Sequence, residues 1–171
     1  MQRGVGLLGM MAMVSWMSGC AVSGQGGDGS VASKVLGTWK LVSVVREEVP
    51  SGVKTDLFGP NPEGYINYGP DGRMMVIIVR SGRSKPVGTI ATSAEAEALF
   101  RSMNSYAGRY TISGNELTHH VDISWNQAWT GTRQLRIAKF EGDRVTLSTP
   151  LSPDPLDGKM SIRSLVWERL K

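Results

Sequence analysis

Eight runs of β-branched and aromatic residues, separated by turn-forming residues, constrain how this chain folds more than any other feature. Three joints are short and rich in turn formers: Gly-Pro-Asp-Gly at 69–72, Gly-Asn at 114–115 and Glu-Gly-Asp at 141–143. Such joints pair neighbouring strands antiparallel. The runs are residues 35–46, 64–68, 73–80, 105–113, 116–125, 132–140, 144–149 and 161–170. The pattern predicts an all-β, up-and-down antiparallel sheet.

Eight strands are enough for such a sheet to close into a barrel, which removes its exposed edges. The interior of an eight-stranded barrel is either filled by side chains or holds one small ligand. A filled interior favours a protein that contacts other proteins, and a hollow one favours ligand binding or catalysis.

One short helix is expected between the third and fourth runs. Thr92 and Glu95 have the spacing of a capping box. One apolar stripe follows, formed by Ala96, Leu99, Phe100 and Met103. Residues 74–79 are apolar at every position, which predicts a strand buried on both faces. We therefore expect the helix to cover the outside of that strand or to cap a barrel end.

The first residues of the chain predict export. Arg3 is followed by an uncharged, largely apolar run at 5–16, which is too short to span a bilayer as a helix. The run ends in Met-Ser-Gly-Cys at 17–20, which resembles the lipobox of bacterial lipoproteins. The resemblance implies that residues 1–19 are a signal peptide and that Cys20 is acylated.

Acylation of Cys20 implies a protein that is anchored through its acyl chains to a membrane of the bacterial cell envelope. In similar lipoproteins, an Asp after the cysteine retains the protein at the inner membrane, so Ala21 implies the outer membrane. Residues 20–34 are rich in Gly and Ser and predict a flexible tether, with the folded domain at 35–171. Since Cys20 is the only cysteine, the domain has no thiol for catalysis or a disulfide.

The chain carries a formal net charge of +4, and its basic residues are scattered, so no nucleic-acid-binding surface is predicted. Motifs of hydrolases, zinc proteases and phosphate-binding loops are absent from the sequence. We expect no cofactor.

Several segments in order resemble one known family. Gly37-Thr38-Trp39 resembles the Gly-x-Trp motif of lipocalins, and residues 35–169 are similar to the bacterial and fungal lipocalin-like domain family. The other matching segments are 64–68, 71–74, 106–110, 119–121 with Ser124, 129–132, Gln134, Arg136 and 165–169. The resemblance implies an eight-stranded lipocalin-like barrel in which Arg169 stacks on Trp39 and closes one end, both in structural roles.

Both histidines of the chain lie on the fifth predicted strand. Alternation puts one set of side chains on the inner face: Leu117, His119, Val121, Ile123 and Trp125. His119 then faces inward and His120 outward, so they cannot share a metal ion, and no metal site is predicted. His120 and Asp122 share the outer face as a solvated pair. For His119 two roles stay open: a buried neutral imidazole, or a group that faces a ligand.

The remaining candidate residues are polar or aromatic groups on neighbouring strands. Gln134 and Arg136 share a face with Phe140, so Arg136 points inward if Phe140 does, and a buried arginine needs a partner. That partner is either internal, Glu116 or Asp122, or a ligand carboxylate. The aromatic candidates for ligand contact are Tyr106, Tyr110 and Trp129.

These residues favour a lipid-anchored barrel that binds or carries a small, mostly apolar molecule, with a carboxylate as one option for meeting Arg136. Two alternatives stay open. The first is a ligand-free module that contacts other envelope proteins. The second is an isomerase or hydrolase in which His119 moves a proton on an apolar substrate. Catalysis is the less favoured reading, because no motif in the sequence requires it.

Overall fold

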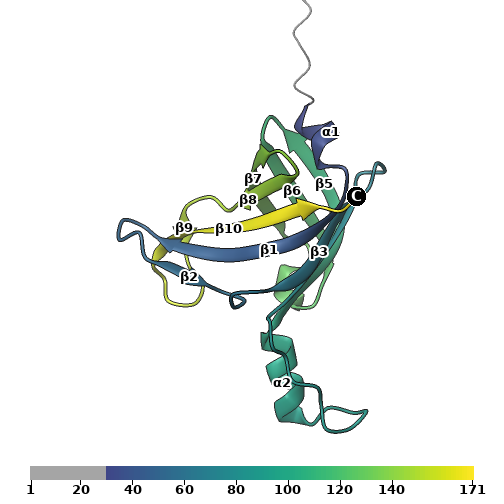
Figure 1. The fold of residues 1–171 in the computed structure, drawn as a ribbon, viewed down its shortest axis with the longest axis vertical. Helices are drawn as coiled ribbons and strands as arrows, with labels where there is room; N and C mark the ends of the chain where they lie inside the picture. The colour runs from purple at the N-terminus through teal and green to yellow at the C-terminus, as the bar shows by residue number, and fades with distance from the viewer. Residues whose placement is uncertain (1–29) are drawn as a thin grey trace, which may run out of the picture.

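The computed structural model describes residues 30–171, whose strands form a closed antiparallel barrel (Figure 1). Each of the eight barrel strands pairs with the next barrel strand along the chain, and the first, β1 (Gly37–Glu48), closes the barrel by pairing with the last, β10 (Met160–Arg169), so that Trp39 lies opposite Arg169. The barrel strands are β1 (Gly37–Glu48), β3 (Glu63–Tyr68), β4 (Arg73–Val79), β5 (Met103–Ser113), β6 (Glu116–Ser124), β7 (Arg133–Glu141), β8 (Arg144–Ser148) and β10 (Met160–Arg169). The predicted eight-stranded up-and-down barrel is confirmed.

Two short strands that the sequence pattern did not predict extend the sheet at one end of the barrel. β2 (Lys54–Asp56) pairs with the far end of β1, and β9 (Ser152–Pro153) pairs with the start of β10. A 3₁₀ turn, η1 (Gln127–Trp129), follows β6. Three residues from these segments, Trp129, Ser152 and Pro153, line the cavity described below, so this end is the mouth of the barrel.

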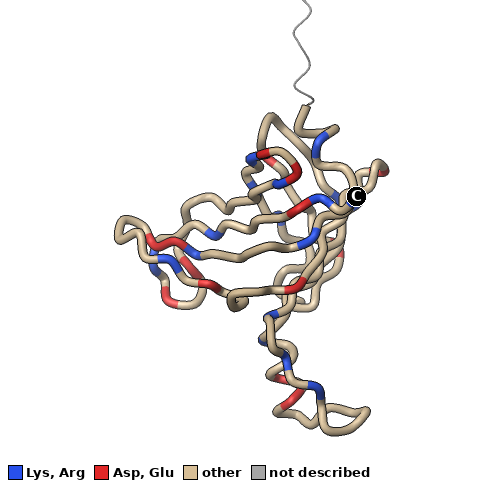
Figure 2. The backbone as a smooth tube through the Cα atoms, viewed as in Figure 1, with Lys and Arg blue, Asp and Glu red and all other residues tan. Residues whose placement is uncertain are grey.

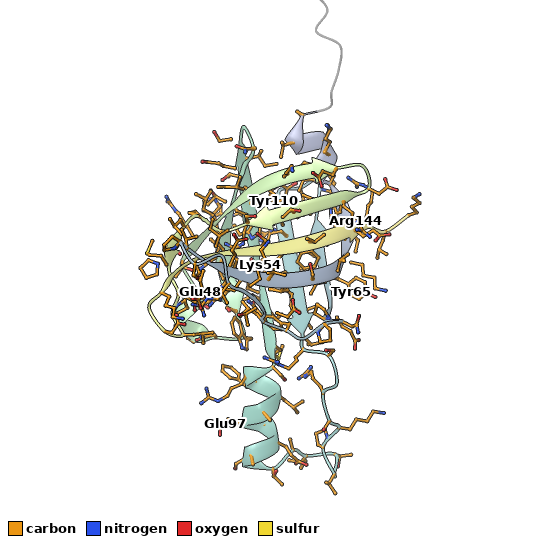
Figure 3. All side chains as sticks on the ribbon, turned by 60° about the vertical axis from the view of Figure 1, so that its left-hand side comes forward. Glu48, Lys54, Tyr65, Glu97, Tyr110 and Arg144 are labelled. Carbon is orange, nitrogen blue, oxygen red and sulfur yellow. The ribbon has the colours of Figure 1, made fainter. Side chains whose placement is uncertain are left out.

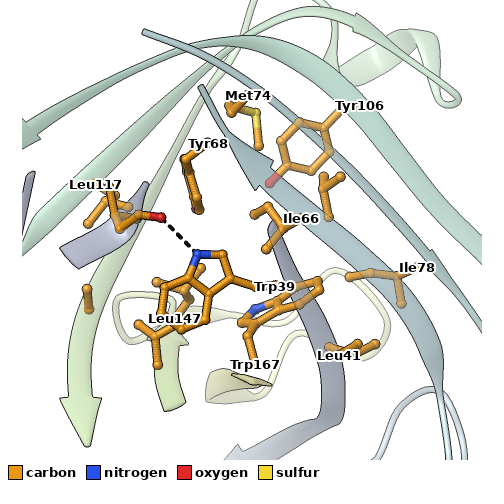
Figure 4. Close-up of a cluster of buried hydrophobic side chains, with 14 of the residues drawn as sticks. Trp39, Leu41, Ile66, Tyr68, Met74, Ile78, Tyr106, Leu117, Leu147 and Trp167 are labelled. Atoms are coloured by element: carbon orange, nitrogen blue, oxygen red, sulfur yellow. Dashed lines mark hydrogen bonds between the residues drawn. The ribbon is translucent and has the colours of Figure 1, made fainter. Parts of the chain in front are cut away.

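The interior away from the mouth is filled by large side chains. Figure 4 shows Trp39 and Trp167 lying among Ile66, Tyr68 and Leu147, all of which are buried. Burial of an aliphatic or aromatic side chain of this size contributes roughly 1.5–3 kcal/mol to stability. The hydrophobic core therefore closes one end of the barrel.

A short helix, α1 (Val31–Val35), covers the closed end. The indole nitrogen of Trp39 donates to the carbonyl of Val35 at 2.8 Å, and the guanidinium carbon of Arg169 lies 4.1 Å from the centre of the Trp39 ring. Arg169 also donates to the carbonyls of Leu36, at 2.7 Å, and Lys34. Residues 31–34, which fall within the predicted tether, are therefore helical and held against the closed end through Lys34.

The expectation that β4 is buried on both faces is wrong. Its side chains alternate: Met74, Val76 and Ile78 are buried, whereas Met75 is 63% exposed and Ile77 is 45% exposed. Together with Tyr65, they form an apolar outer surface that no helix within residues 30–171 covers (Figure 3). The unbroken apolar run at 74–79 therefore did not mean burial on both faces.

The predicted helix, α2 (Ser93–Arg101), exists and begins with the predicted capping box of Thr92 and Glu95. Neither of its predicted positions, over β4 or capping a barrel end, is correct, because α2 projects from the barrel as part of an arm between β4 and β5 and buries none of its residues (Figures 1 and 3). The arm contacts the barrel at its base, where the indole of Trp125 donates to the carbonyl of Phe100 at 3.3 Å. Within residues 30–171, no helix has the length and apolarity needed to cross a membrane.

A β-bulge changes the faces of β6. The pairing of β5 with β6 shifts between Ala107 and Gly108, so that Ile123 pairs with Ala107 and is 67% exposed. The prediction that Ile123 and Trp125 face inward is therefore wrong, and Trp125 packs outside the strand against Phe100. The bulge depends on Gly108, because a Cβ on that residue would lie 1.9 Å from the carbonyl oxygen of His120.

Candidate ligand-binding cavity

A cavity of about 250 Å³ opens at the mouth of the barrel. Its walls combine apolar and polar side chains from several strands and loops. The apolar ones include Leu57, Phe58 and Trp129. The polar ones include Asn104, Gln134 and Arg136. The volume is slightly below the range of about 300–1,000 Å³ that is usual for drug-sized ligands, so the cavity suits a small molecule.

A second, much smaller cavity of about 20 Å³ lies deeper in the barrel. It shares Asn104 and Arg136 with the mouth cavity, and Tyr106, His119 and Trp167 also line it. About 10–15 Å³ is enough to hold one water molecule, so the inner cavity has room for a single oxygen-sized group. The barrel is therefore filled at its closed end and hollow only toward its mouth.

His119 is buried between two tyrosines. The hydroxyl of Tyr68 lies 2.8 Å from Nε2, and the hydroxyl of Tyr106 lies 2.9 Å from Nδ1. Burial, together with the nearby positive charge of Arg136, holds the pKa of His119 well below its usual value. His119 is therefore a neutral imidazole whose two ring nitrogens are both occupied.

The two tyrosines keep their protons. Burial raises the pKa of Tyr68 well above its usual value and also raises the pKa of Tyr106. The guanidinium of Arg136 opposes part of each rise, which places its positive charge close to both rings. The three side chains form a neutral hydrogen-bonded group at the base of the cavity.

Arg136 lies between the two cavities without a carboxylate partner among residues 30–171. It donates to the carbonyl of Leu135 at 2.7 Å. The internal partners suggested by the sequence do not reach it, because Glu116 is exposed and Asp122 pairs on the outer face with Arg73, at 3.6 Å. Asp122 faces outward because it follows the buried Val121 in the alternation of β6.

The other predicted ligand contacts divide into two groups. Gln134 lines the mouth cavity and donates to Thr132 Oγ1 at 3.1 Å, and Trp129 lines the same cavity with its ring centre 5.8 Å from that of Tyr106. Tyr110 lies elsewhere, because its hydroxyl donates to the carbonyl of Gly69 at 2.8 Å and its ring packs against Tyr68. The structure thus brings together Tyr106, His119, Gln134, Arg136 and Trp129, but not Tyr110.

The two histidines lie on opposite faces of β6. His119 is buried, whereas Nε2 of His120 lies 3.0 Å from the hydroxyl of Thr111 on the outer face, and His120 does not pair with Asp122. In the part of the chain that the structure describes, no three His, Cys, Asp or Glu side chains are grouped to hold a metal ion.

Sequence reasoning missed an ion-pair network on one wall of the mouth. The buried carboxylate of Asp154 accepts two hydrogen bonds from Arg163 Nη2, both at 2.8 Å, and a third from its Nε at 3.0 Å. Arg46 Nε lies 3.3 Å from the same carboxylate, and Arg46 Nη2 lies 2.8 Å from Asp157. Figure 2 shows acidic and basic residues close together at this end of β1 and β10. No strand periodicity marks Asp154, because it lies in a loop.

Two buried polar atoms near the inner cavity also had no signal in the sequence. The indole nitrogen of Trp167 and Oδ1 of Asn104 are buried without a hydrogen-bond partner among the described residues. Both residues line the inner cavity. Most buried polar atoms in native proteins have a partner, so these two point to a group that the polypeptide itself does not supply.

Comparison with known proteins identifies the family. The curated 4'-hydroxy-3'-methoxypropiophenone carrier protein ppsC of Aspergillus oryzae is 30% identical over 87 residues, which are 46% of this chain and 78% of that protein. A solved lipocalin-like protein from Bacteroides uniformis is 11% identical, with a TM-score of 0.42 over 80% of this chain and 99% of the other. A family model described as a lipocalin-like domain matches residues 36–170. The chain therefore belongs to the lipocalin-like domain family.

Proposed function

We propose that this protein binds a small, mostly apolar ligand in its mouth cavity, with Arg136 as the polar anchor. The observation that carries the proposal is an arginine without a carboxylate partner in residues 30–171, placed where a cavity of about 250 Å³ narrows into the barrel. An arginine at such a site needs an anion or a hydrogen-bond acceptor. A carbonyl or carboxylate group of a ligand meets that need.

Carriage is favoured over catalysis by the state of His119. Both of its ring nitrogens are engaged by tyrosine hydroxyls, so neither is free to take a proton from a ligand. The relative in Aspergillus oryzae is named as a carrier of 4'-hydroxy-3'-methoxypropiophenone, an aromatic ketone, which also supports binding of a small aromatic molecule.

We further propose that the barrel is held to the bacterial outer membrane by acyl chains on Cys20, after removal of residues 1–19 as a signal peptide. Cys20 lies outside the described residues, and the proposal rests on the lipobox-like residues 17–20. The described chain begins next to α1, which covers the closed end of the barrel, at the end away from the mouth. Such a position places the cavity near a store of apolar molecules.

Ligand binding is tested by mass spectrometry of organic extracts from the purified full-length protein. We expect a small molecule that is recovered with the wild type and depleted in Arg136→Gln. Arg133→Gln is the matched control, because Arg133 is exposed on the outer face of the same strand. Equal recovery from Arg136→Gln and wild type contradicts the anchor role, and recovery of nothing from the wild type contradicts ligand carriage.

The lipid anchor is tested separately by metabolic labelling with a fatty-acid analogue. We expect label on the wild-type protein in the outer-membrane fraction and none on Cys20→Ser. Label that persists on Cys20→Ser contradicts acylation at this residue, and label found only in the inner-membrane fraction contradicts the outer-membrane assignment.

A further inference from the structure

We propose that the inner cavity is a subsite for one carbonyl oxygen of the ligand, with donors from Trp167, Tyr106 and Arg136. The inference rests on the proposed function, because it assigns the deep end of the same site. Beyond the proposed function, it names the chemical group that binds in the inner cavity, a carbonyl oxygen, and the class of ligand, a small aromatic ketone.

The first observation is the size of the inner cavity. At about 20 Å³ it has room for one oxygen-sized group. Ile78, Asn104 and Arg136 line both this cavity and the mouth cavity, so the two lie next to each other. In the proposed subsite, a ligand seated in the mouth therefore places one small terminal atom in the inner cavity.

The second observation is the indole nitrogen of Trp167. Trp167 is 0% exposed and lines the inner cavity, and its N–H has no acceptor among the described residues. By contrast, the indole N–H groups of Trp39 and Trp125 donate to the carbonyls of Val35 and Phe100. A buried N–H without an acceptor is unfavourable, so an acceptor atom bound in the inner cavity would stabilise the indole N–H of Trp167.

The third observation concerns the proton of Tyr106. The hydroxyls of Tyr68 and Tyr106 face Nε2 and Nδ1 of His119, and the tautomer of the imidazole sets which hydroxyl donates to the ring. The proposed subsite uses the Nδ1–H tautomer, in which Tyr68 donates to Nε2 and Nδ1 donates to the oxygen of Tyr106. The Tyr106 hydroxyl proton is then free to donate into the inner cavity, which Tyr106 lines. In this tautomer His119 acts as a positioning residue for the Tyr106 hydroxyl.

Arg136 completes the set of donors, because it lines both cavities and lies close to Tyr106. A carbonyl oxygen has two lone pairs, so any two of the three N–H or O–H groups are enough to bind it. In the mouth, Leu57, Phe58 and Trp129 offer apolar surface for an aromatic ring, and Asn104 Oδ1 offers an acceptor for a ligand hydroxyl.

The test compares two probes that differ only at the carbonyl. The first is 4'-hydroxy-3'-methoxypropiophenone, and the second is the same molecule with its carbonyl replaced by a methylene group. Calorimetric titration of the full-length wild type is expected to show roughly tenfold tighter binding of the ketone, as a net gain of one to two hydrogen bonds predicts.

Two variants locate this preference. Trp167→Phe keeps an aromatic ring but removes the N–H, and Tyr106→Phe removes the hydroxyl; each is expected to lower the preference for the ketone to roughly threefold or less. The matched controls are Trp125→Phe, outside the barrel, and Tyr110→Phe, whose hydroxyl donates to Gly69; both are expected to keep the wild-type ratio.

The possible outcomes separate the two proposals. Equal binding of both probes to the wild type overturns the subsite and leaves ligand binding intact, with the inner cavity then holding a water molecule. An unchanged ratio in both Trp167→Phe and Tyr106→Phe also overturns the subsite. If neither probe binds to the wild type, binding of small aromatic molecules is overturned, and the subsite with it.

Discussion

The hydroxyl oxygen of Tyr68 lies 2.8 Å from Nε2 of His119, and both side chains are buried in the barrel. Tyr106 occupies the other ring nitrogen, so within residues 30–171 neither nitrogen of the imidazole has a carboxylate partner to compensate a positive charge. Protonation of His119 would therefore place an uncompensated charge beside Arg136. This arrangement links the stability of the interior to pH.

Stability is expected to fall as the pH decreases below about 6.5, the usual pKa of histidine in an unfolded chain. The folded-state pKa of His119 is lower, so the unfolded state binds more protons in this window. The stability that neutral His119 gives the fold is fully present above about pH 6.5. Below that pH, the free energy of unfolding falls by up to about 1.36 kcal/mol per pH unit. Urea unfolding between about pH 7.5 and pH 5 measures it. His119→Gln should lose this pH dependence of the free energy of unfolding, and His120→Gln should keep it. An unchanged pH dependence in His119→Gln contradicts its attribution to His119.

Removal of the Asp154 carboxylate is expected to destabilise the protein by about 3 kcal/mol, since it leaves Arg163 and Arg46 without their buried partner. Asp154→Asn makes this change with little loss of volume. Asp157→Asn is the control, because that carboxylate is more exposed and should cost less. Chemical denaturation measures both variants, and equal costs contradict a special role for Asp154.

The same network predicts a loss of stability in acid. Burial opposes ionisation of Asp154, but the N–H of Leu156 and the guanidiniums of Arg163 and Arg46 lower its pKa overall. The carboxylate therefore stabilises the fold above its unfolded-state pKa of about 3.9, and this contribution disappears as the pH falls through the lower folded-state pKa. Acid unfolding of the wild type should show this loss, and Asp154→Asn should lack it.

Arg169→Gln is expected to cost about 1–3 kcal/mol. The change removes the stacking of the guanidinium on Trp39 and its hydrogen bonds to the carbonyls of Leu36 and Lys34. Arg144→Gln is the control, because Arg144 makes only an exposed pair with Glu168. Urea unfolding compares the two variants, and a loss below about 0.5 kcal/mol in Arg169→Gln shows that the closed end does not need this contact.

The alternation of β4 predicts different costs at adjacent methionines. Met74→Ala is expected to destabilise the protein by about 2–5 kcal/mol, because Met74 is buried in the core. Met75→Ala should change stability by less than about 0.5 kcal/mol, because Met75 is 63% exposed. Similar costs at the two positions, measured by thermal or urea unfolding, would show that the outer face of β4 is covered.

Gly108→Ala is expected to destabilise the barrel by about 1–3 kcal/mol or more, because the added Cβ would collide with the carbonyl oxygen of His120 at the bulge. Ser105→Ala on the same strand is the control for a small change without such a collision. Amide hydrogen exchange at Val121 and Asp122 reports whether the bulge rearranges. If Gly108→Ala is as stable as the wild type, the bulge does not require glycine at this position.

The fold was largely predictable because strand periodicity and turn residues are local signals. The hairpins at 69–72, 114–115 and 141–143 join strands that pair as expected, and the inward position of Arg136 follows from that of Phe140. The failures have non-local causes. Met75 and Ile77 look like core residues in sequence, but α2 projects away from the barrel and both stay exposed within residues 30–171.

The site was predictable only where alternation held. His119 was placed inside and Asp122 outside correctly, but the bulge opposite Gly108 turned Ile123 outward, and no local pattern marks that glycine as a bulge partner. The partners of His119, Tyr68 and Tyr106, come from β3 and β5, so their convergence depends on barrel register. Asp154 and Asn104 joined the cavity through loop and barrel geometry that the sequence pattern does not encode.

Closure of one end by Trp39, Arg169 and α1 leaves the mouth as the route into the barrel for the described part of the chain. A cavity with one opening is a dead end, so an incoming molecule cannot push the resident one out through the far side. Exchange then proceeds in two steps, departure followed by entry, and the rate of release is independent of the concentration of a competing ligand.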